Sequence, residues 1–120
     1  MRLTVNPMVK EEELNDVFSA LAHPTRRAML ARLAAGNKSV GELAEPFKLS
    51  APAITKHLHV LEEAGLVRRS VDGRIHILQL EAEPLRGAAN WIQPYARFWH
   101  GQFDALEDFL RKSNKSRDKR

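Results

Sequence analysis

The chain contains no cysteine in its 120 residues. This absence excludes a disulfide framework, a thiolate metal site and a cysteine nucleophile, and it fits a reducing cytoplasm. No apolar run approaches the roughly 20 residues that a membrane span needs. The charged stretch from Lys10 to Glu13 soon follows a short apolar start, which is not the pattern of a signal peptide. We therefore expect a cytoplasmic protein with no membrane partner.

Residue patterns typical of enzymes are missing as well. The sequence shows no paired carboxylates in a plausible cleft, no glycine-rich phosphate loop and no serine–histidine spacing that would activate a nucleophile. We expect no catalytic activity and no cofactor.

Excess positive charge is confined to the C-terminal end. The net charge is +4, but residues 111–120 carry six basic side chains against Asp118 alone, a net of +5, so the preceding 110 residues sum to −1. Such a tail is more often a solubilising, disordered end than a specific binding element. Contact of the tail with DNA remains the alternative.

Two helices are predicted before residue 37. Apolar residues at i, i+3, i+4 and i+7 predict an amphipathic helix over residues 11–22. His23 precedes a proline and therefore interrupts this helix. Pro24 is suited to the first turn of a second helix, which stops at Gly36-Asn37.

Two further helices are predicted from their capping residues. Ser39 can cap a short third helix, with Glu42 three residues later as in a capping box. Ser50 can cap a fourth helix that has Pro52 in its first turn and Gly65 after its end. The backbone N–H groups near Ser50 are expected to favour a phosphate oxygen.

A β-hairpin follows the fourth helix. Residues 66–71 and 74–80 are β-prone runs separated by Asp72-Gly73, a strong hairpin signal. A last helical region is predicted from Glu83 to about Lys112, kinked or divided by Pro94.

This order of elements predicts a mainly α (α+β) fold, a winged helix-turn-helix arranged α-α-α-α-β-β-α and dimeric through its terminal helices. The chain is long enough for one domain. We expect an N-terminal arm at residues 1–10, one DNA-binding and dimerisation domain at 11–112, and a basic disordered tail at 113–120.

The fourth helix carries the predicted contacts with DNA. At 100° per residue, Ile54, Leu58 and Leu61 share one face, with His57 at its edge, and small or hydrogen-bonding residues occupy the opposite face. Such a face suits the major groove, although any solvated helix can carry these residue types. The predicted contacts from this helix are Ser50, Ala51, Pro52, Thr55, Lys56 and His59.

Basic residues also gather on the hairpin. Arg68, Arg69 and Arg74 flank or enter it, with His76 nearby, and such a cluster can follow the DNA backbone into the minor groove. The alternative is that exposed edge strands carry basic residues to prevent aggregation.

The closing helix is unusually rich in aromatic residues. Its apolar residues cover too wide an arc for one helix on one small domain, and patches of this kind usually mark an interface. An intrachain core or a small-ligand pocket is the alternative. A two-fold dimer predicts a pseudo-palindromic operator with reading helices about 34 Å apart. The predicted dimer residues are Leu14, Phe18, Tyr95, Phe98, Trp99, Phe103 and Leu106.

Three stretches resemble the arsenical-resistance-repressor (ArsR) family of winged-helix regulators: LAHPTRRAMLARLAAG at 21–36, LSAPAITKHLHVLEEAGLV at 49–67 and DGR at 72–74. The resemblance implies a homodimeric repressor that releases DNA when a signal arrives. It also carries the family's DNA contacts onto the fourth-helix residues above and onto Arg68 and Arg74. Ala51 departs from the glutamine often found there, so one base contact is altered or lost.

The resemblance also bears on the signal. Metal-sensing relatives carry a Cys-Val-Cys stretch where this chain has Ser39 and Gly41, so it resembles a metal-independent branch that lacks the cysteine box. The last helix could present His100, Asp104 and Glu107 on one face. One imidazole with two carboxylates is, however, a weak set of metal ligands. We expect no metal site and leave the inducer unknown. The alternatives are a repressor responsive to a metal or small ligand at that helix and a winged-helix protein-interaction module.

Overall fold

The computed structural model describes the backbone of residues 7–100 and 108–112, with side chains from residue 11 onward. The chain divides into two compact units, the first ending at Ala88 and the second beginning at Ala89.

The first unit begins with two helices, α1 (Pro7–Leu21) and α2 (Pro24–Ala34). α1 starts at Pro7, four residues before the boundary predicted for the first helix. Pro7 tolerates this place because the first turn of a helix needs no intrahelical N–H donor. His23 ends α1 as predicted, and its Nδ1 also accepts a hydrogen bond from the Thr25 N–H at 3.1 Å, which caps α2.

Both predicted serine caps are confirmed. Ser39 caps α3 (Val40–Ala44) in a reciprocal capping box with Glu42. The Ser39 hydrogen bonds lower the pKa of the Glu42 carboxyl. Ser50 caps α4 (Ala51–Glu63), where its Oγ accepts from the Ala53 N–H at 3.3 Å. Gly65 follows α4 with a φ of +74°, the left-handed conformation of a helix-terminating glycine.

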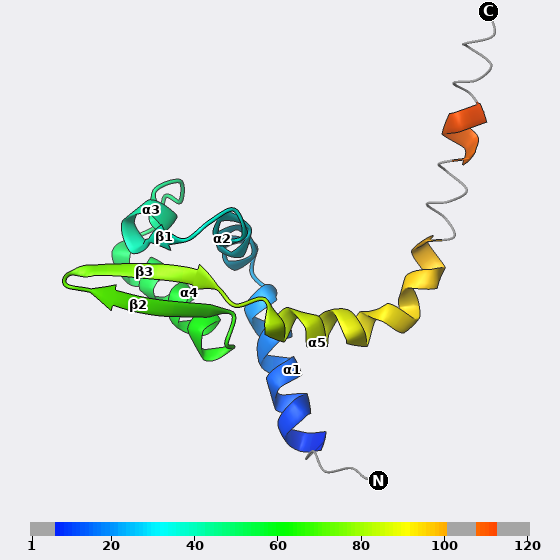
Figure 1. The fold of residues 1–120 in the computed structure, drawn as a ribbon, viewed down its shortest axis with the longest axis horizontal. Helices are drawn as coiled ribbons and strands as arrows, with labels where there is room; N and C mark the ends of the chain where they lie inside the picture. The colour runs from blue at the N-terminus through cyan, green and yellow to red at the C-terminus, as the bar shows by residue number, and fades with distance from the viewer. Residues whose placement is uncertain (1–6, 101–107, 113–120) are drawn as a thin grey trace, which may run out of the picture. The chain divides into compact units, whose positions relative to one another are not determined.

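Three antiparallel strands form a small sheet in the order β1-β3-β2: β1 (Lys38–Ser39), β2 (Val67–Asp72) and β3 (Ile75–Leu80). β1 was not predicted, because two residues are too short for any periodicity. The strands β2 and β3 form the hairpin, called the wing below, and its tip extends past α3 and α4 in the view of Figure 1.

The wing turn differs by one residue from the prediction. Asp72 pairs with Ile75, so the two loop residues are Gly73 and Arg74 rather than Asp72 and Gly73. Only Gly73 has a positive φ, +63°, as a type II′ turn requires at its first central position. Arg74 therefore lies in the loop and not in a strand.

The core of the first unit joins its helices to the base of the wing. The apolar face of α4 is buried as predicted, with Leu58 1% and Leu61 0% exposed. Leu66 and Leu78 bring the base of the wing into the same cluster, and Ala88 of α5 (Glu83–Ile92) completes it.

In the second unit the helix changes character at Pro94. The α5 helix gives way to a 3-10 turn, η1 (Gln93–Tyr95), and residues 96–100 are again helical. The predicted interruption at Pro94 is confirmed. Residues 108–112 are helical as well.

Candidate DNA-binding surface

The polar face of α4 is exposed, as the sequence predicts. Ala51, Pro52, Thr55, Lys56 and His59 are all exposed, and we call this set the reading face. The opposite face is buried in the core, so the core fixes which side of α4 is presented to the solvent. Compact residues in the first turn allow that end of the helix to approach a groove closely.

The start of α4 offers less to an anion than the sequence suggested. The Ala53 N–H is already bound by the Ser50 hydroxyl, and Pro52 has no N–H. The Ile54 N–H donates to the Ser50 carbonyl as the first helical hydrogen bond. Within the first turn, the Ala51 N–H is thus the donor left for a phosphate oxygen.

The two basic side chains of the reading face differ in their surroundings. His59 Nε2 lies 3.2 Å from Glu63 Oε1, and both side chains are 70% exposed. No ion pair involves Lys56 in the part of the chain that the structure describes. Lys56 is therefore the better placed of the two to meet a guanine or a phosphate.

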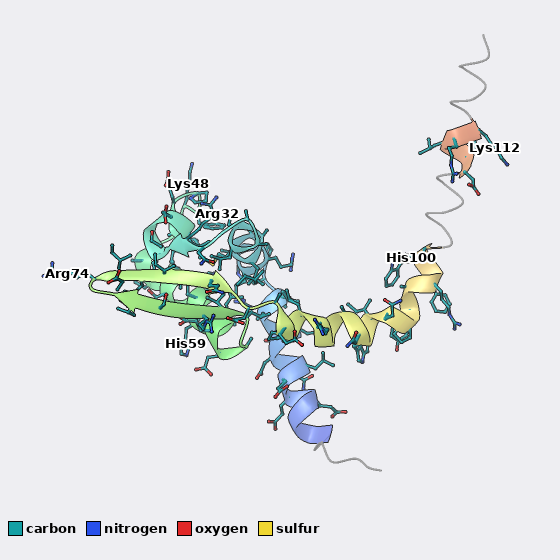
Figure 2. All side chains as sticks on the ribbon, in the orientation of Figure 1. Arg32, Lys48, His59, Arg74, His100 and Lys112 are labelled. Carbon is teal, nitrogen blue, oxygen red and sulfur yellow. The ribbon has the colours of Figure 1, made fainter. Side chains whose placement is uncertain are left out.

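Three predicted arginine contacts on the wing occupy three different environments. Arg74 lies in the turn at the tip of the wing and points away from the helices (Figure 2). Arg68 is exposed and pairs with Glu81 at 3.1 Å. Arg69 instead turns inward to Glu62 of α4, with 27% of its side chain exposed. Its placement therefore gives no support to a DNA contact by Arg69.

A second inward-facing arginine, which the sequence analysis missed, holds the middle of α4. Arg26 of α2 donates from Nη1 to Nδ1 of His57 at 3.2 Å, and from Nε and Nη2 to the carbonyls of Ala20 and Ser19. The His57 ring also lies against that of His23, with centroids 4.4 Å apart. The basic pair Arg26-Arg27, which begins two residues after Pro24, was the available sequence signal, and it does not indicate a contact with a residue 31 positions away.

This surrounding lowers the pKa of His57. Burial is the first cause, followed by unfavourable electrostatic interactions with His23, Arg26 and Lys56. The neutral ring is the form that can accept at Nδ1 from a guanidinium, which has only donors. Neutral His57 therefore links α4 to α2 and, through Arg26, to the end of α1.

A shallow groove of about 420 Å³ lies between the start of α3 and the wing. It contains Ser39 and Gly41, the positions that the resemblance matches to the metal-binding cysteines of relatives, and neither can supply a thiolate. Among the described residues no three His, Asp or Glu side chains are grouped to hold a metal ion. Of the three residues on the last helix considered as an alternative metal set, Asp104 and Glu107 lie outside the described residues. The groove is lined by Ser39, Val40, Gly41, Arg69, Arg74, Ile75 and His76.

The predicted dimer residues divide between the two units. Leu14 and Phe18 are partly buried against the core of the first unit. Tyr95, Phe98 and Trp99 of the second unit are 47%, 63% and 39% exposed. Phe103 and Leu106 lie outside the described residues.

No helix within the described ranges is both long and apolar enough to cross a membrane.

Comparison with known proteins identifies the same region. Residues 21–70 match the model of a family described as a helix-turn-helix domain. The transcriptional repressor SdpR of Bacillus subtilis is 34% identical over 79 residues, which cover 66% of this chain and 88% of that protein. The HTH-type transcriptional regulator Rv2034 of Mycobacterium tuberculosis is 40% identical over 82 residues, covering 68% of this chain and 74% of that protein.

Solved structures agree with these relatives. The crystal structure of an ArsR family transcriptional regulator superposes with a TM-score of 0.68 at 41% identity, covering 75% of this chain and 93% of that one. An ArsR-like transcriptional regulator from Rhodococcus sp. RHA1 gives a TM-score of 0.64 at 29% identity, covering 84% and 95%. The chain therefore belongs to the ArsR-like family of winged helix-turn-helix transcriptional regulators, which bind DNA.

Proposed function

We propose that the chain is a cytoplasmic, homodimeric transcriptional repressor that places one α4 helix in the major groove at each half of a pseudo-palindromic operator. The observation that carries this proposal is the division of α4 into a buried apolar face and an exposed reading face. The name of the similar Bacillus subtilis protein, a transcriptional repressor, supports repression as the outcome of binding.

Each group on the surface has a distinct task in this proposal. Thr55 and Lys56 contact base edges, where a good contact contributes about 1–3 kcal/mol of discrimination between bases. Ala51 and Pro52 meet thymine methyl groups. The cap residue Ser50 brings the start of the helix near a phosphate, and His59 reaches a base or a phosphate.

The wing supplies contacts with the DNA backbone. Arg74 enters or follows the minor groove from the wing tip, and Arg68 contacts a phosphate from the strand. Phosphate contacts of this kind fix the orientation of the protein on the duplex, whereas the α4 side chains read the sequence.

The homodimer is supported by the exposed aromatic residues of the second unit. Trp91, Tyr95, Phe98 and Trp99 are all more than one third exposed, and the Trp91 and Tyr95 rings lie 5.2 Å apart. Aromatic side chains are enriched at interfaces because they bury much area at a small entropic cost. A second copy of this chain would cover them, with Phe103, Leu106 and residues of α1 taking part.

A footprint on the DNA upstream of this protein's own gene tests the proposal. We expect two protected half-sites about one helical turn, or about 34 Å, apart, related by a pseudo-two-fold. A single protected half-site would contradict the dimeric arrangement. If no DNA from that region or from neighbouring promoters is retarded by the protein, repression by direct binding is wrong.

A further inference from the structure

One guanidinium joins the reading helix to both strands of the wing. On Arg69 of β2, Nη2 donates to Glu62 Oε1 at 2.7 Å and Nε donates to Glu62 Oε2 at 3.1 Å. Nη1 of the same side chain lies 3.1 Å from Nδ1 of His76 on β3. Glu62 is the last but one residue of α4, so three elements meet at this single side chain.

The pairing of Arg69 with Glu62 has the features of a well-formed contact. It is bidentate, so the planar guanidinium fixes the direction of the carboxylate as well as its distance. Only about a quarter of each side chain is exposed, 27% for Arg69 and 28% for Glu62. The hydrogen bonds that Arg69 donates to Glu62 raise the pKa of Arg69 against the opposing effect of burial. Water therefore screens this ion pair less than it screens the more exposed pair of Arg68 with Glu81.

The register of the wing explains why this contact matters for the tip. Arg69 lies opposite Leu78, which is fully buried, and His76 lies two pairs nearer the tip, which places it on the same face. Beyond this point the hairpin has little packing, because Val71 is 60% and Ile75 is 57% exposed. A two-stranded ribbon is marginally stable by itself. Among the described residues, the Glu62–Arg69–His76 contact is thus the outermost side-chain hydrogen-bonded contact between α4 and the wing.

We propose that Arg69 is a positioning residue for DNA recognition: it sets the direction of the wing relative to α4, so that Arg74 at the tip and the reading face engage the same duplex together. This proposal rests on the proposed function. It replaces the direct DNA contact that the sequence suggested for Arg69. Glu62 holds the guanidinium from the helix, and His76 passes the constraint to the second strand.

A double-mutant cycle separates positioning from direct contact. If Arg69 acts by placing Arg74, Arg69→Ala lowers operator affinity about tenfold in the native chain but less than about twofold in an Arg74→Ala background. If Arg69 binds a phosphate itself, the two losses multiply, and the proposal is wrong. Circular dichroism melting of each variant confirms that the protein remains folded.

Substitution of Glu62 gives a second test, because the proposal and simple electrostatics predict opposite changes in DNA affinity. Removing one negative charge from a DNA-binding surface should tighten binding through simple electrostatics. We expect Glu62→Gln instead to weaken operator binding about fivefold, because the wing loses its anchor. Glu81→Gln is the matched control, since Glu81 also pairs with a wing arginine, and it should leave affinity unchanged or raise it. Equal effects of both substitutions would overturn the proposal.

A measurement without DNA keeps this inference distinct from the proposed function. In Arg69→Ala, amide hydrogen exchange at residues 71–76 should be faster than in the native chain, whereas Arg68→Ala should leave it unchanged. If exchange is unchanged in Arg69→Ala, Arg69 does not hold the wing and the inference is wrong, whatever the DNA results. If exchange responds but the native protein binds no operator, the proposed function fails and the anchoring role stands.

Discussion

The α4 helix and the helical segment around Pro94 both carry regularly spaced large apolar residues, yet they place them in opposite surroundings. On α4, Ile54, Leu58 and Leu61 are at most 4% exposed. In the second unit, Tyr95 and Phe98 are 47% and 63% exposed. Among the described residues, the chain itself buries the apolar side chains of α4, whereas those of the second unit stay exposed. The difference teaches that apolar spacing predicts a helix face but not which partner buries it.

The largest effect on stability is expected at the buried apolar face of α4. Leu58→Ala leaves a cavity in a core position that is 1% exposed, and it should lower the free energy of unfolding by about 2–5 kcal/mol. Urea denaturation followed by circular dichroism measures this loss. If Leu58→Ala lowers the free energy of unfolding no more than Phe98→Ala does at the same protein concentration, the contrast between the buried and the exposed apolar residues is wrong.

Substitution of the exposed aromatic residues of the second unit should weaken dimerisation. Phe98→Asp places a charge in the aromatic patch and should weaken dimerisation by about 30- to 100-fold, the effect of removing a hot-spot side chain. Sedimentation velocity across a dilution series measures the change. Arg86→Gln, which loses an exposed charge in an i,i+3 pair on α5, is the control and should sediment like the native protein. An unchanged profile for Phe98→Asp would show that this patch is not the dimer interface.

Substitutions on the reading face should lower the affinity for DNA without changing dimerisation or stability. Thr55→Ala and Lys56→Ala should each weaken operator binding by about five- to tenfold, because each loses one contact at the groove. Both residues are exposed and outside the core, so the dimer and its melting temperature should be preserved. Fluorescence anisotropy with a labelled operator measures affinity. Normal affinity in both variants would contradict the assignment of α4 as the reading helix.

The smallest effect is expected from His57, the residue between the two faces of α4. Its lowered pKa means that the unfolded chain takes up a proton near the ordinary histidine pKa of 6.5, whereas the folded chain does so only at lower pH. The unfolded state therefore binds more protons in this window. Stability from His57 is fully present above about pH 6.5 and is lost progressively as the pH falls below it.

A variant can isolate this contribution. His57→Gln keeps an acceptor for Arg26 but cannot titrate, so its free energy of unfolding should fall less steeply than that of the native protein between about pH 7 and about pH 5. Urea unfolding at several pH values gives both slopes. Identical slopes would mean that protonation of His57 is not coupled to folding.

The sequence alone predicted most of the fold and part of the surface. Helix caps at Ser39 and Ser50 were readable because each contact spans only three residues. The buried stripe of α4 was readable because helical periodicity is fixed by the backbone. The order of these elements, together with the hairpin, was enough to indicate the winged helix-turn-helix fold that the relatives share.

Only the tertiary structure decided which arginines face outward. Strand alternation places Arg68 and Arg69 on opposite faces but does not say which face meets α4. In the structure Arg68 pairs at the surface, Arg69 anchors the wing to Glu62 and Arg74 stands at the tip. The turn register placed Arg74 there, and it depends on the pairing of two strands. The contact of Arg26 with His57 joins helices far apart in sequence. Caps and periodicity are contacts within one turn, so the sequence determines them; partners between elements exist only once the core has brought those elements together.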